Sequence, residues 1–430
     1  MLARLDVRDA RADLAPRLGI GALGADADLE VAQSVADIVD AVRRRGDAAV
    51  RDYTERFDGP RLDSLRVTPE ECEAAVAETP TVVRDALELA ADRITEYHQQ
   101  QVGEPPAAYS AAGVTVTEAI RAVDRAGLYV PGGRAAYPST VLMTSIPARV
   151  AGVLERVLCV PPDADGRVPA VTLTAAVLTG VTEIYRVGGA QAIAAMAYGT
   201  ESIPPVDVIV GPGNAYVDAA KRLVAGRGIV GIDGPAGPSE LVVIADETAD
   251  PELVALDLAA QAEHGPGGTA YVVSWNAEVL DHVLDAILGY LASAPRAEEI
   301  RSTLTTGGRA VLVRDVDQAV AVANLVAPEH LELLVDNPSD LIPAIRHAGA
   351  VFIDAPAAVG DYVAGANHVL PTGRAARFAS ALRVDDFRTH MHVVRATPDG
   401  LAAIGPAAVV LAEAEGLSAH AASVRRRISG

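Results

Sequence analysis

A strand–turn–helix unit recurs between residues 128 and 238, and no other feature of the chain restricts its fold so strongly. Each unit opens with a short run of aliphatic and β-branched residues, passes through a turn rich in glycine or proline and continues into an apolar helical pattern. The units begin at LYVPGG, RVLCVPP, EIYRVGG and VDVIVGPGN. Strands that alternate with helices of this length predict a parallel sheet covered by helices on both faces.

A similar series of predicted strands and helices follows residue 239. SELVVIAD, AYVVSW, AVLVRD, LELLVD and GAVFIDA are predicted strands separated by helical stretches. The length of 430 residues leaves room for two such units, because a single core need not account for the whole chain. Two α/β units in one chain predict a cleft between them.

The segments outside these series are predicted to be auxiliary. Residues 1–25 end in GIGALG, where Gly19, Gly21 and Gly24 have the spacing of a dinucleotide-binding fingerprint. That fingerprint needs a buried strand before it, and RADLAPRL is not one, so we predict a linker. Residues 28–44 and 69–101 are predicted helices with one apolar stripe each. The tail from residue 386 is too short to bury a core alone, so it should pack on this chain or on a partner subunit.

Composition excludes several classes of function. The net charge of −21 disfavours nucleic acid as a partner, because phosphate contacts need clustered Lys and Arg. No apolar run has the length of a membrane span, and the charged N-terminus lacks the apolar core of a secretory signal. Cys72 and Cys159 are too few for a disulfide framework or a cysteine-rich zinc site. We therefore expect a cytoplasmic protein that binds neither membrane nor nucleic acid.

Three glycine-rich turns fall at the carboxyl ends of predicted strands: Pro131-Gly132-Gly133, Gly188-Gly189 and Gly211-Pro212-Gly213. Ligands of parallel sheets bind beyond these ends, and glycine lets backbone N–H groups approach a phosphate. The turns therefore indicate a nucleotide site. None has the standard dinucleotide spacing, so turns that serve packing alone are the alternative.

Imidazole chemistry is predicted for the second half of the chain, because eight of the nine histidines lie at or after position 264. In DLAAQAEHGPGG a helix is predicted to end at the glycine turn, which puts Gln261 and His264 on one face. These two residues, Asp361 and His420 offer nitrogen and oxygen donors of the kind that zinc prefers. Sequence spacing does not show that they meet. A solvated helix end with surface histidines is therefore the alternative.

Glu329 and His330, in APEHLEL, are a candidate acid–base pair. Histidine titrates near neutral pH, and burial can raise the pKa of a glutamate toward it. Neighbouring residues of an extended strand point to opposite sides, so the pair can cooperate only in a turn, which Pro328 permits. A purely structural role at the strand entry is the alternative.

Eight stretches of the chain, in order, resemble the histidinol dehydrogenase family. They are GLYVPGG with YPSTVLMTSIPARVAG, VGGAQAIAAMAYGT, VDVIVGPGNAYVDAAKR, GPSELVVIAD, AQAEHGPGG, APEHLEL, VGDYVAGANHVLPT and EGLSAH. The resemblance implies a cytoplasmic homodimer with shared active sites, NAD as cofactor and one Zn²⁺ per subunit. It also implies two successive oxidations, from L-histidinol through L-histidinal to L-histidine, at the end of histidine biosynthesis.

The resemblance further implies roles for individual residues. Glu329 and His330 would be the acid–base pair, with His330 taking the hydroxyl proton and Glu329 activating water for the second oxidation. Neither cysteine matches a catalytic position. The implied zinc ligands are Gln261, His264, Asp361 and, from the other subunit, His420. The implied substrate contacts are these four residues together with Ser239, His330, His368 and Glu415, and the implied NAD contacts are Tyr129, Gln191 and Asn214.

The fold expected from pattern and resemblance together is α/β, with two doubly wound, incomplete Rossmann-like domains that have parallel sheets. The first domain is expected to be discontinuous, formed by residues 26–127 and 239–381, and the second, on the NAD side, by residues 128–238. The N-terminal segment 1–25 and the C-terminal segment 382–430 are expected to mediate dimerisation.

Three other functions are alternatives to a histidinol dehydrogenase. A related zinc- and NAD-dependent dehydrogenase of another small alcohol is the nearest, but it should depart from the family at the substrate-holding positions, and these all match. A zinc hydrolase would bind no nucleotide, so the glycine turns after the strands argue against it. A non-catalytic scaffold would have no reason to keep the full polar set.

Overall fold

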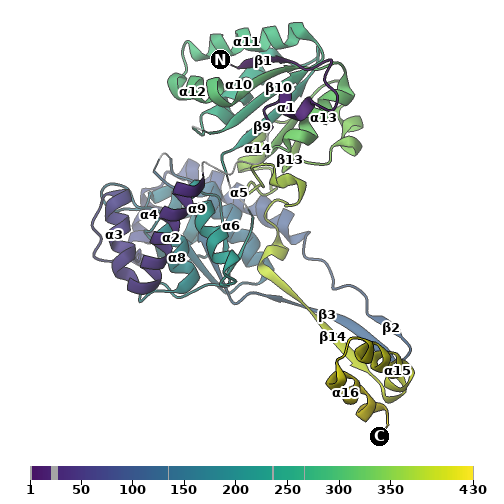
Figure 1. Cartoon of the computed structure of the whole chain (residues 1–430). Helices are drawn as coiled ribbons and strands as arrows, with labels where there is room; N and C mark the ends of the chain where they lie inside the picture. The colour runs from purple at the N-terminus through teal and green to yellow at the C-terminus, as the bar shows by residue number, and fades with distance from the viewer. Residues whose placement is uncertain (1, 21–27, 134, 235–236, 266, 430) are drawn as a thin grey trace.

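The computed structural model describes residues 2–20, 28–133, 135–234, 237–265 and 267–429. Two α/β bodies lie one above the other in Figure 1, and a thin arm extends from the lower body to the C-terminus. Both bodies contain an all-parallel sheet, so the predicted α/β class with parallel sheets is confirmed. Part of the predicted linker, with Gly21 and Gly24, lies outside the described residues, as does Pro266.

The lower body is built on a five-stranded parallel sheet in the order β6-β5-β4-β7-β8. Its strands are β4 (Arg125–Tyr129), β5 (Glu155–Cys159), β6 (Glu183–Tyr185), β7 (Val208–Val210) and β8 (Gly231–Ile232). The chain runs outward from β4 through β5 to β6 and then returns to place β7 on the other side of β4. The carboxyl ends of β4 and β7 are therefore the switch point at which such sheets bind ligands.

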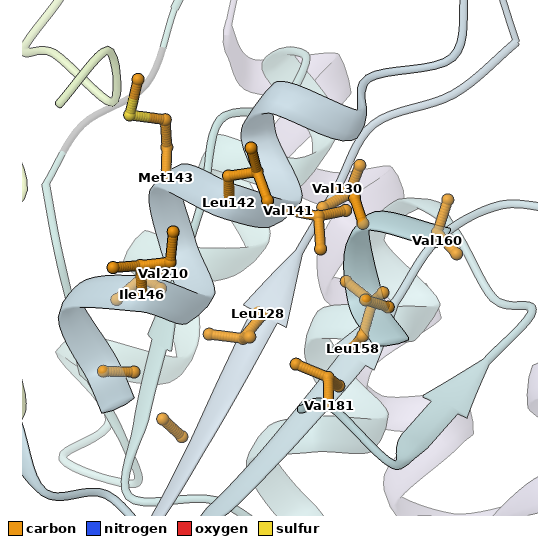
Figure 2. Close-up of a cluster of buried hydrophobic side chains, with 14 of the residues drawn as sticks. Leu128, Val130, Val141, Leu142, Met143, Ile146, Leu158, Val160, Val181 and Val210 are labelled. Carbon is orange, nitrogen blue, oxygen red and sulfur yellow. The ribbon is translucent and has the colours of Figure 1, made fainter. Parts of the chain in front are cut away.

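Helices cover both faces of this sheet. One face packs on α4 (Pro69–Glu78), α5 (Thr81–Gln99), α6 (Pro138–Ala151) and α7 (Ala170–Leu178). The other packs on α2 (Asp28–Arg45), α3 (Asp47–Asp58), α8 (Gly189–Tyr198) and α9 (Ala215–Gly226). Figure 2 shows the first core, where Leu128 and Leu158 of the sheet lie beneath Val141, Leu142 and Ile146 of α6.

The upper body contains a six-stranded parallel sheet in the order β1-β11-β10-β9-β12-β13. Its strands are β1 (Ala3–Asp6), β9 (Glu240–Ala245), β10 (Thr269–Ser274), β11 (Gly308–Leu312), β12 (His330–Leu334) and β13 (Ala350–Ile353). The helices of one face are α10 (Pro251–Ala262), α11 (Ala277–Leu291) and α12 (Ala297–Gly307). Those of the other are α1 (Leu14–Arg17) and α13 (Val316–Val326).

Short elements follow β13 and lead to the arm. They are α14 (Ala357–Tyr362) and the 3₁₀ helices η2 (Ala375–Arg377) and η3 (Val384–Phe387), while η1 (Pro338–Ala344) precedes β13. The arm is an antiparallel sheet, β14-β3-β2, formed by β2 (Tyr109–Ala111), β3 (Val114–Ala122) and β14 (Arg388–Ala396). Helices α15 (Pro398–Ala414) and α16 (Ser418–Ile428) pack on each other at its tip (Figure 1).

Two of the expected domain boundaries are wrong. Residues 28–101 do not join residues 239–381, because α2 packs on α8 and α9, α4 on α7, and α5 on α6, all in the lower body. The N-terminal segment is not separate either, because β1 pairs with β11 and extends the upper sheet. The first boundary could not be predicted because the apolar stripe of a helix shows that one face is buried but not which sheet buries it. The second could not be predicted because the strand ARLD is charged, as a strand at the edge of a sheet can be.

Among the described residues, no helix is long and apolar enough to cross a membrane.

Candidate active site

The candidate site lies where the carboxyl edge of the lower sheet meets the amino edge of the upper sheet. A cavity of about 60 Å³ is lined by Pro212 and Asp233, which follow β7 and β8, and by Ser239 and Glu329, which precede β9 and β12. Residues 368–372 line it as well. A cavity therefore lies between the two units, as expected, and Glu329 of the candidate acid–base pair lines it.

His330 is the first residue of β12 and lies between two carboxylates. Its side chain is 3% exposed, its Nδ1 is 3.7 Å from Glu329 Oε2, and its Nε2 is 3.3 Å from Asp361 Oδ1. Burial alone would lower the pKa of His330, but the charge of Glu329 and the contact with Asp361 outweigh it and raise the pKa to about 9. A buried imidazole held in this way can take up a proton and pass it on.

Glu329 and His330 lie where the chain bends as it enters β12. Ala327, with a φ of 50° in the left-handed region, ends α13, and the chain bends again at Glu329. Glu329 Oε2 accepts a hydrogen bond of 3.0 Å from the backbone N–H of Glu240. Burial raises the pKa of Glu329, and the neighbouring His330 opposes this rise. The turn expected at Pro328 thus brings the pair together.

Gln261 and His264 extend from the end of α10 toward the same site. Asp250 accepts a hydrogen bond from Glu252 N at the start of this helix, which ends at Ala262. Gln261 is 5% exposed, and among the described residues its Nε2 has no hydrogen-bond partner. His264 is exposed in the single chain, and its Nδ1 lies 3.3 Å from Ser239 Oγ. A solvated helix end is therefore wrong for Gln261, which points inward.

Asp361, near the end of α14, interacts with three histidines. Burial alone would raise its pKa, but the contact with His330 and the charges of His330, His368 and His264 lower it. The Nδ1 of His368 lies 2.8 Å from the backbone carbonyl of Asp361, and its Nε2 lies 3.2 Å from Thr140 Oγ1 on α6. His368 thereby connects the upper site to the lower body.

The residues of one chain make an incomplete site for a metal ion. Gln261, His264 and Asp361 offer an amide, an imidazole and a carboxylate, a donor set that zinc accepts. A glutamine would bind the ion through its amide oxygen, and the buried Nε2 of Gln261, unpaired among the described residues, leaves this amide free of a competing donor contact. Within the described parts of the chain, no three His, Cys, Asp or Glu side chains are grouped closely enough to hold a metal ion. A zinc site here needs the glutamine and a ligand from elsewhere.

Tyr129 and Gln191 lie at the switch point of the lower sheet. Tyr129 ends β4, and its hydroxyl accepts a hydrogen bond of 3.1 Å from Gly189 N. Gly189 has a φ of 63°, and a Cβ there would lie 2.6 Å from Gln191 Oε1. Gln191 is 1% exposed, and both polar atoms of its amide are unpaired among the described residues. A buried free amide beside a glycine turn fits contact with a polar ligand.

Asn214 lies on the neighbouring turn and caps α9. Its side-chain oxygen accepts hydrogen bonds from Tyr216 N at 3.0 Å and Val217 N at 3.2 Å. Gly211 of the same turn has a φ of 120°, and a Cβ at this position would lie 2.1 Å from Tyr129 O. Glycine is therefore required for β4 and this turn to approach each other at the carboxyl edge.

Glu415 and His420 are not brought to the site by their own chain. Glu415 follows α15, His420 lies in α16, and both are exposed at the tip of the arm, away from the cavity (Figure 1).

Three groups near the site were not anticipated from the sequence. Glu240, directly after Ser239, has its pKa raised to about 7 by burial and by the charge of Glu329. Lys221 and Asp233 form a buried ion pair beside the Gly211 turn. Asp257 and Glu332 lie on the two elements that carry Gln261 and His330, α10 and β12. For this last pair a signal existed, because Asp257 precedes Gln261 by one helical turn and Glu332 shares a strand face with His330.

Known proteins with similar sequences and structures share one description. The family model described as histidinol dehydrogenase matches residues 24–428. The chain is 51% identical over 394 residues to a histidinol dehydrogenase of Parasynechococcus marenigrum, covering 91% of this chain and 90% of that one. It is 47% identical to one of Methanothermobacter thermautotrophicus, covering 93% and 94%. A crystal structure of histidinol dehydrogenase from Elizabethkingia anophelis matches with a TM-score of 0.93 and 35% identity, covering 100% and 98%.

Proposed function

Because the chain belongs to the histidinol dehydrogenase family, we propose that it oxidises L-histidinol to L-histidine at the junction of its two α/β bodies. Like the rest of its family, it is an NAD-dependent oxidoreductase. The observation that supports this location is the buried His330 between the carboxylates of Glu329 and Asp361. Each oxidation must release a proton, and His330 in its neutral form can accept it, while the two carboxylates stabilise the imidazolium that results.

In the first oxidation, His330 takes the hydroxyl proton as the carbinol hydrogen leaves as hydride, which gives the aldehyde. Bound NAD supplies the hydride acceptor for both oxidations. Tyr129, Gln191 and Asn214 are the proposed contacts to it, on the carboxyl edge of the lower sheet. Ser239 and His368 are the proposed substrate contacts within the same chain, because they line the cavity beside Glu329.

In the second oxidation, the aldehyde must first be hydrated. Glu329 lies in the cavity wall next to His330, with its pKa raised by burial, and is the proposed acceptor of the proton of the attacking water. The hydrate then loses hydride as the first alcohol did, and His330 again takes the hydroxyl proton. Neither cysteine lines the cavity, since Cys159 is buried at the end of β5, paired with Tyr129, and Cys72 lies in α4.

We propose zinc as the second cofactor, one ion per subunit, held by Gln261, His264, Asp361 and His420 of the partner subunit. Bound zinc supplies a fixed positive charge that orients the imidazole and amine of the substrate. His264 is exposed in the single chain, which leaves it accessible to a ligand from a partner subunit.

The missing ligand leads us to propose a homodimer with shared sites. Glu415 and His420 lie on an arm that cannot bring them to the cavity of their own chain. The tip of the arm exposes Val410 and Leu411 at 63% and 65%, and Val394 of β14 at 65%. Apolar side chains exposed together on a thin arm are typical of a surface that a partner covers. A second copy of the chain would provide that cover, and this arm would bring Glu415 and His420 to the partner's substrate.

We place the protein in the cytoplasm, since both of its cysteines are free thiols, as is usual in a reducing compartment.

One assay tests the proposed reaction. Purified protein given zinc, NAD and L-histidinol should form two NADH for each histidine. Absence of NADH would contradict the proposal, and NADH with a different small alcohol alone would assign a different substrate. Substitution His420→Asn should abolish zinc binding and activity while the protein stays folded. Zinc content at the wild-type level would show that His420 is not a ligand.

A further inference from the structure

Glu332 is a buried carboxyl group that fixes the start of α14. It lies two residues after His330 on the same face of β12, and it is 0% exposed. Its Oε1 accepts a hydrogen bond of 2.7 Å from the backbone N–H of Ala357, the first residue of α14. Pro356, at the N-cap position, provides no side-chain cap. Glu332 therefore replaces the missing cap of the helix that carries Asp361.

The second oxygen of Glu332 has no donor. Glu332 Oε2 is buried, and no donor among the described residues forms a hydrogen bond with it. The side chain within hydrogen-bonding reach is Asp257 of α10, another carboxyl group. His330 also acts on Glu332 through its charge. Neither α10 nor α14 brings a lysine or an arginine to this carboxyl group.

Two ionised carboxylates in contact in a buried site repel each other, and neither can donate a hydrogen bond. A single proton between them removes one charge and supplies the donor that Glu332 lacks. We infer that Asp257 and Glu332 share one proton and that this carboxyl–carboxylate pair joins α10 and α14 to β12. Burial raises the pKa of both groups, as such sharing requires.

The three elements joined by this pair are the ones that carry the candidate site. Asp257 lies one helical turn before Gln261 on α10, Glu332 lies beside His330 on β12, and the N–H of Ala357 begins the short helix that ends with Asp361 and Tyr362. Asp257 and Glu332 are thus positioning residues. They touch neither substrate nor cofactor, but they set the spacing of the groups that do. This inference rests on the proposed function for its effect on zinc, but not for the shared proton.

Infrared spectroscopy of the metal-free protein at neutral pH tests the shared proton directly. Wild-type protein should show a C=O band from the protonated carboxyl of the pair. Asp257→Asn and Glu332→Gln should each lose that same band, because the new amide donates the hydrogen bond and the remaining carboxylate ionises. If the band that one substitution removes survives the other, the inference is overturned, because one residue would then hold the proton by itself. A band from Glu240, whose pKa is raised to about 7, should be the same in all three proteins.

Zinc affinity tests the positioning role. Glu332→Gln keeps both hydrogen bonds and should stay within a few-fold of wild type. Glu332→Met has a similar size but no polar atoms, and it should lower zinc affinity about 10- to 100-fold, the usual effect of losing a residue that supports a metal ligand. Leu280→Ala, a core change on α11, controls for general loss of stability and should leave zinc affinity unchanged. Equal affinities for the Gln and Met variants would refute the positioning role, whereas absence of zinc from wild type would contradict the proposed function and leave the infrared result valid.

Discussion

The proton affinity of His330 is set by the side chain next to it in sequence. In the metal-free protein the pKa of His330 is raised from 6.5 to about 9, against the effect of burial, by Glu329 and Asp361. Because the folded-state value lies above the unfolded one, the pair stabilises the fold fully below pH 6.5 and loses this contribution as the pH rises through 9.

Substitution Glu329→Gln should lower the pKa of His330, because the anionic neighbour that favours the imidazolium is gone while burial remains. The proton NMR signal of the ring, followed against pH in metal-free protein, measures this shift. An unchanged midpoint for His330 would mean that Asp361 alone holds the proton.

The buried ion pair between Lys221 and Asp233, beside the turn at Gly211, should be important for stability. Lys221 has a fully buried side chain, contacts Asp233 and donates a hydrogen bond of 3.0 Å to Gly211 O, while Asp233 Oδ2 accepts one of 2.7 Å from Gly211 N. Asp233→Ala leaves a buried ammonium without its carboxylate and should cost about 3–5 kcal/mol of unfolding free energy. Urea denaturation measures the loss.

The double variant Lys221→Met, Asp233→Leu separates lost charge pairing from lost packing. It leaves no buried charge behind, so it should be destabilised less than Asp233→Ala. The double variant should bind NAD more weakly than wild type, because both side chains that hold the backbone of Gly211 are absent. A larger loss in the double variant would show that packing, not the unpaired charge, decides the cost.

At the scale of the element, the inner strands of both sheets could be predicted from sequence, because a parallel strand buried on both faces is a short apolar run between turn residues. The edge strands β1, which is charged, and β8, which has two residues, could not. SELVVIAD, AYVVSW and LELLVD became β9, β10 and β12. The sheet covered by each N-terminal helix could not be predicted, because the apolar stripe of a helix is the same whichever sheet buries it. The left-handed conformation of Ala327, where the chain leaves α13 before Glu329 and His330, could not be predicted either, because alanine rarely adopts it.

Helix α14 is held against β13 at a distance that only glycine permits. A Cβ at Gly360 would lie 2.4 Å from Phe352 Cε1, and the Phe352 ring in turn packs on His330 with 5.8 Å between ring centroids. Gly360→Ala should push α14 outward and move Asp361 from His330. We expect folded protein that has lost at least about 1 kcal/mol of stability, together with a lower kcat.

A second substitution tests this reason for the loss. Phe352→Leu removes the ring atom that the new methyl group meets, so the double variant should recover stability relative to Gly360→Ala alone. Thermal unfolding of the four proteins provides the coupling energy. Additive losses would mean that Gly360 is needed for something other than the approach of α14 to Phe352.

For the whole molecule, the arm is the feature that a single chain cannot explain. It carries exposed apolar side chains together with Glu415 and His420, the two proposed site residues that lie far from the cavity of their own chain. Its own core is small, consisting of Val409, Ala412 and Ala421. Its residues could be assigned to the site only through the resemblance, because spacing in one sequence cannot show that a ligand comes from another chain.

Mixed dimers decide whether the arm of one chain completes the site of the other. Glu329→Gln and His420→Asn should each be nearly inactive alone. In a mixed dimer with shared sites, one site contains both substitutions and the other contains neither. Mixing equal amounts after dissociation and reassociation should therefore restore about a quarter of wild-type activity, since half of the dimers are mixed and half of their sites are intact. If each chain completes its own site, every site keeps one substitution and mixing restores nothing. The double variant Glu329→Gln, His420→Asn mixed with wild type is the matched control: shared sites leave each mixed dimer with one substitution in each site, so only the wild-type dimers should be active.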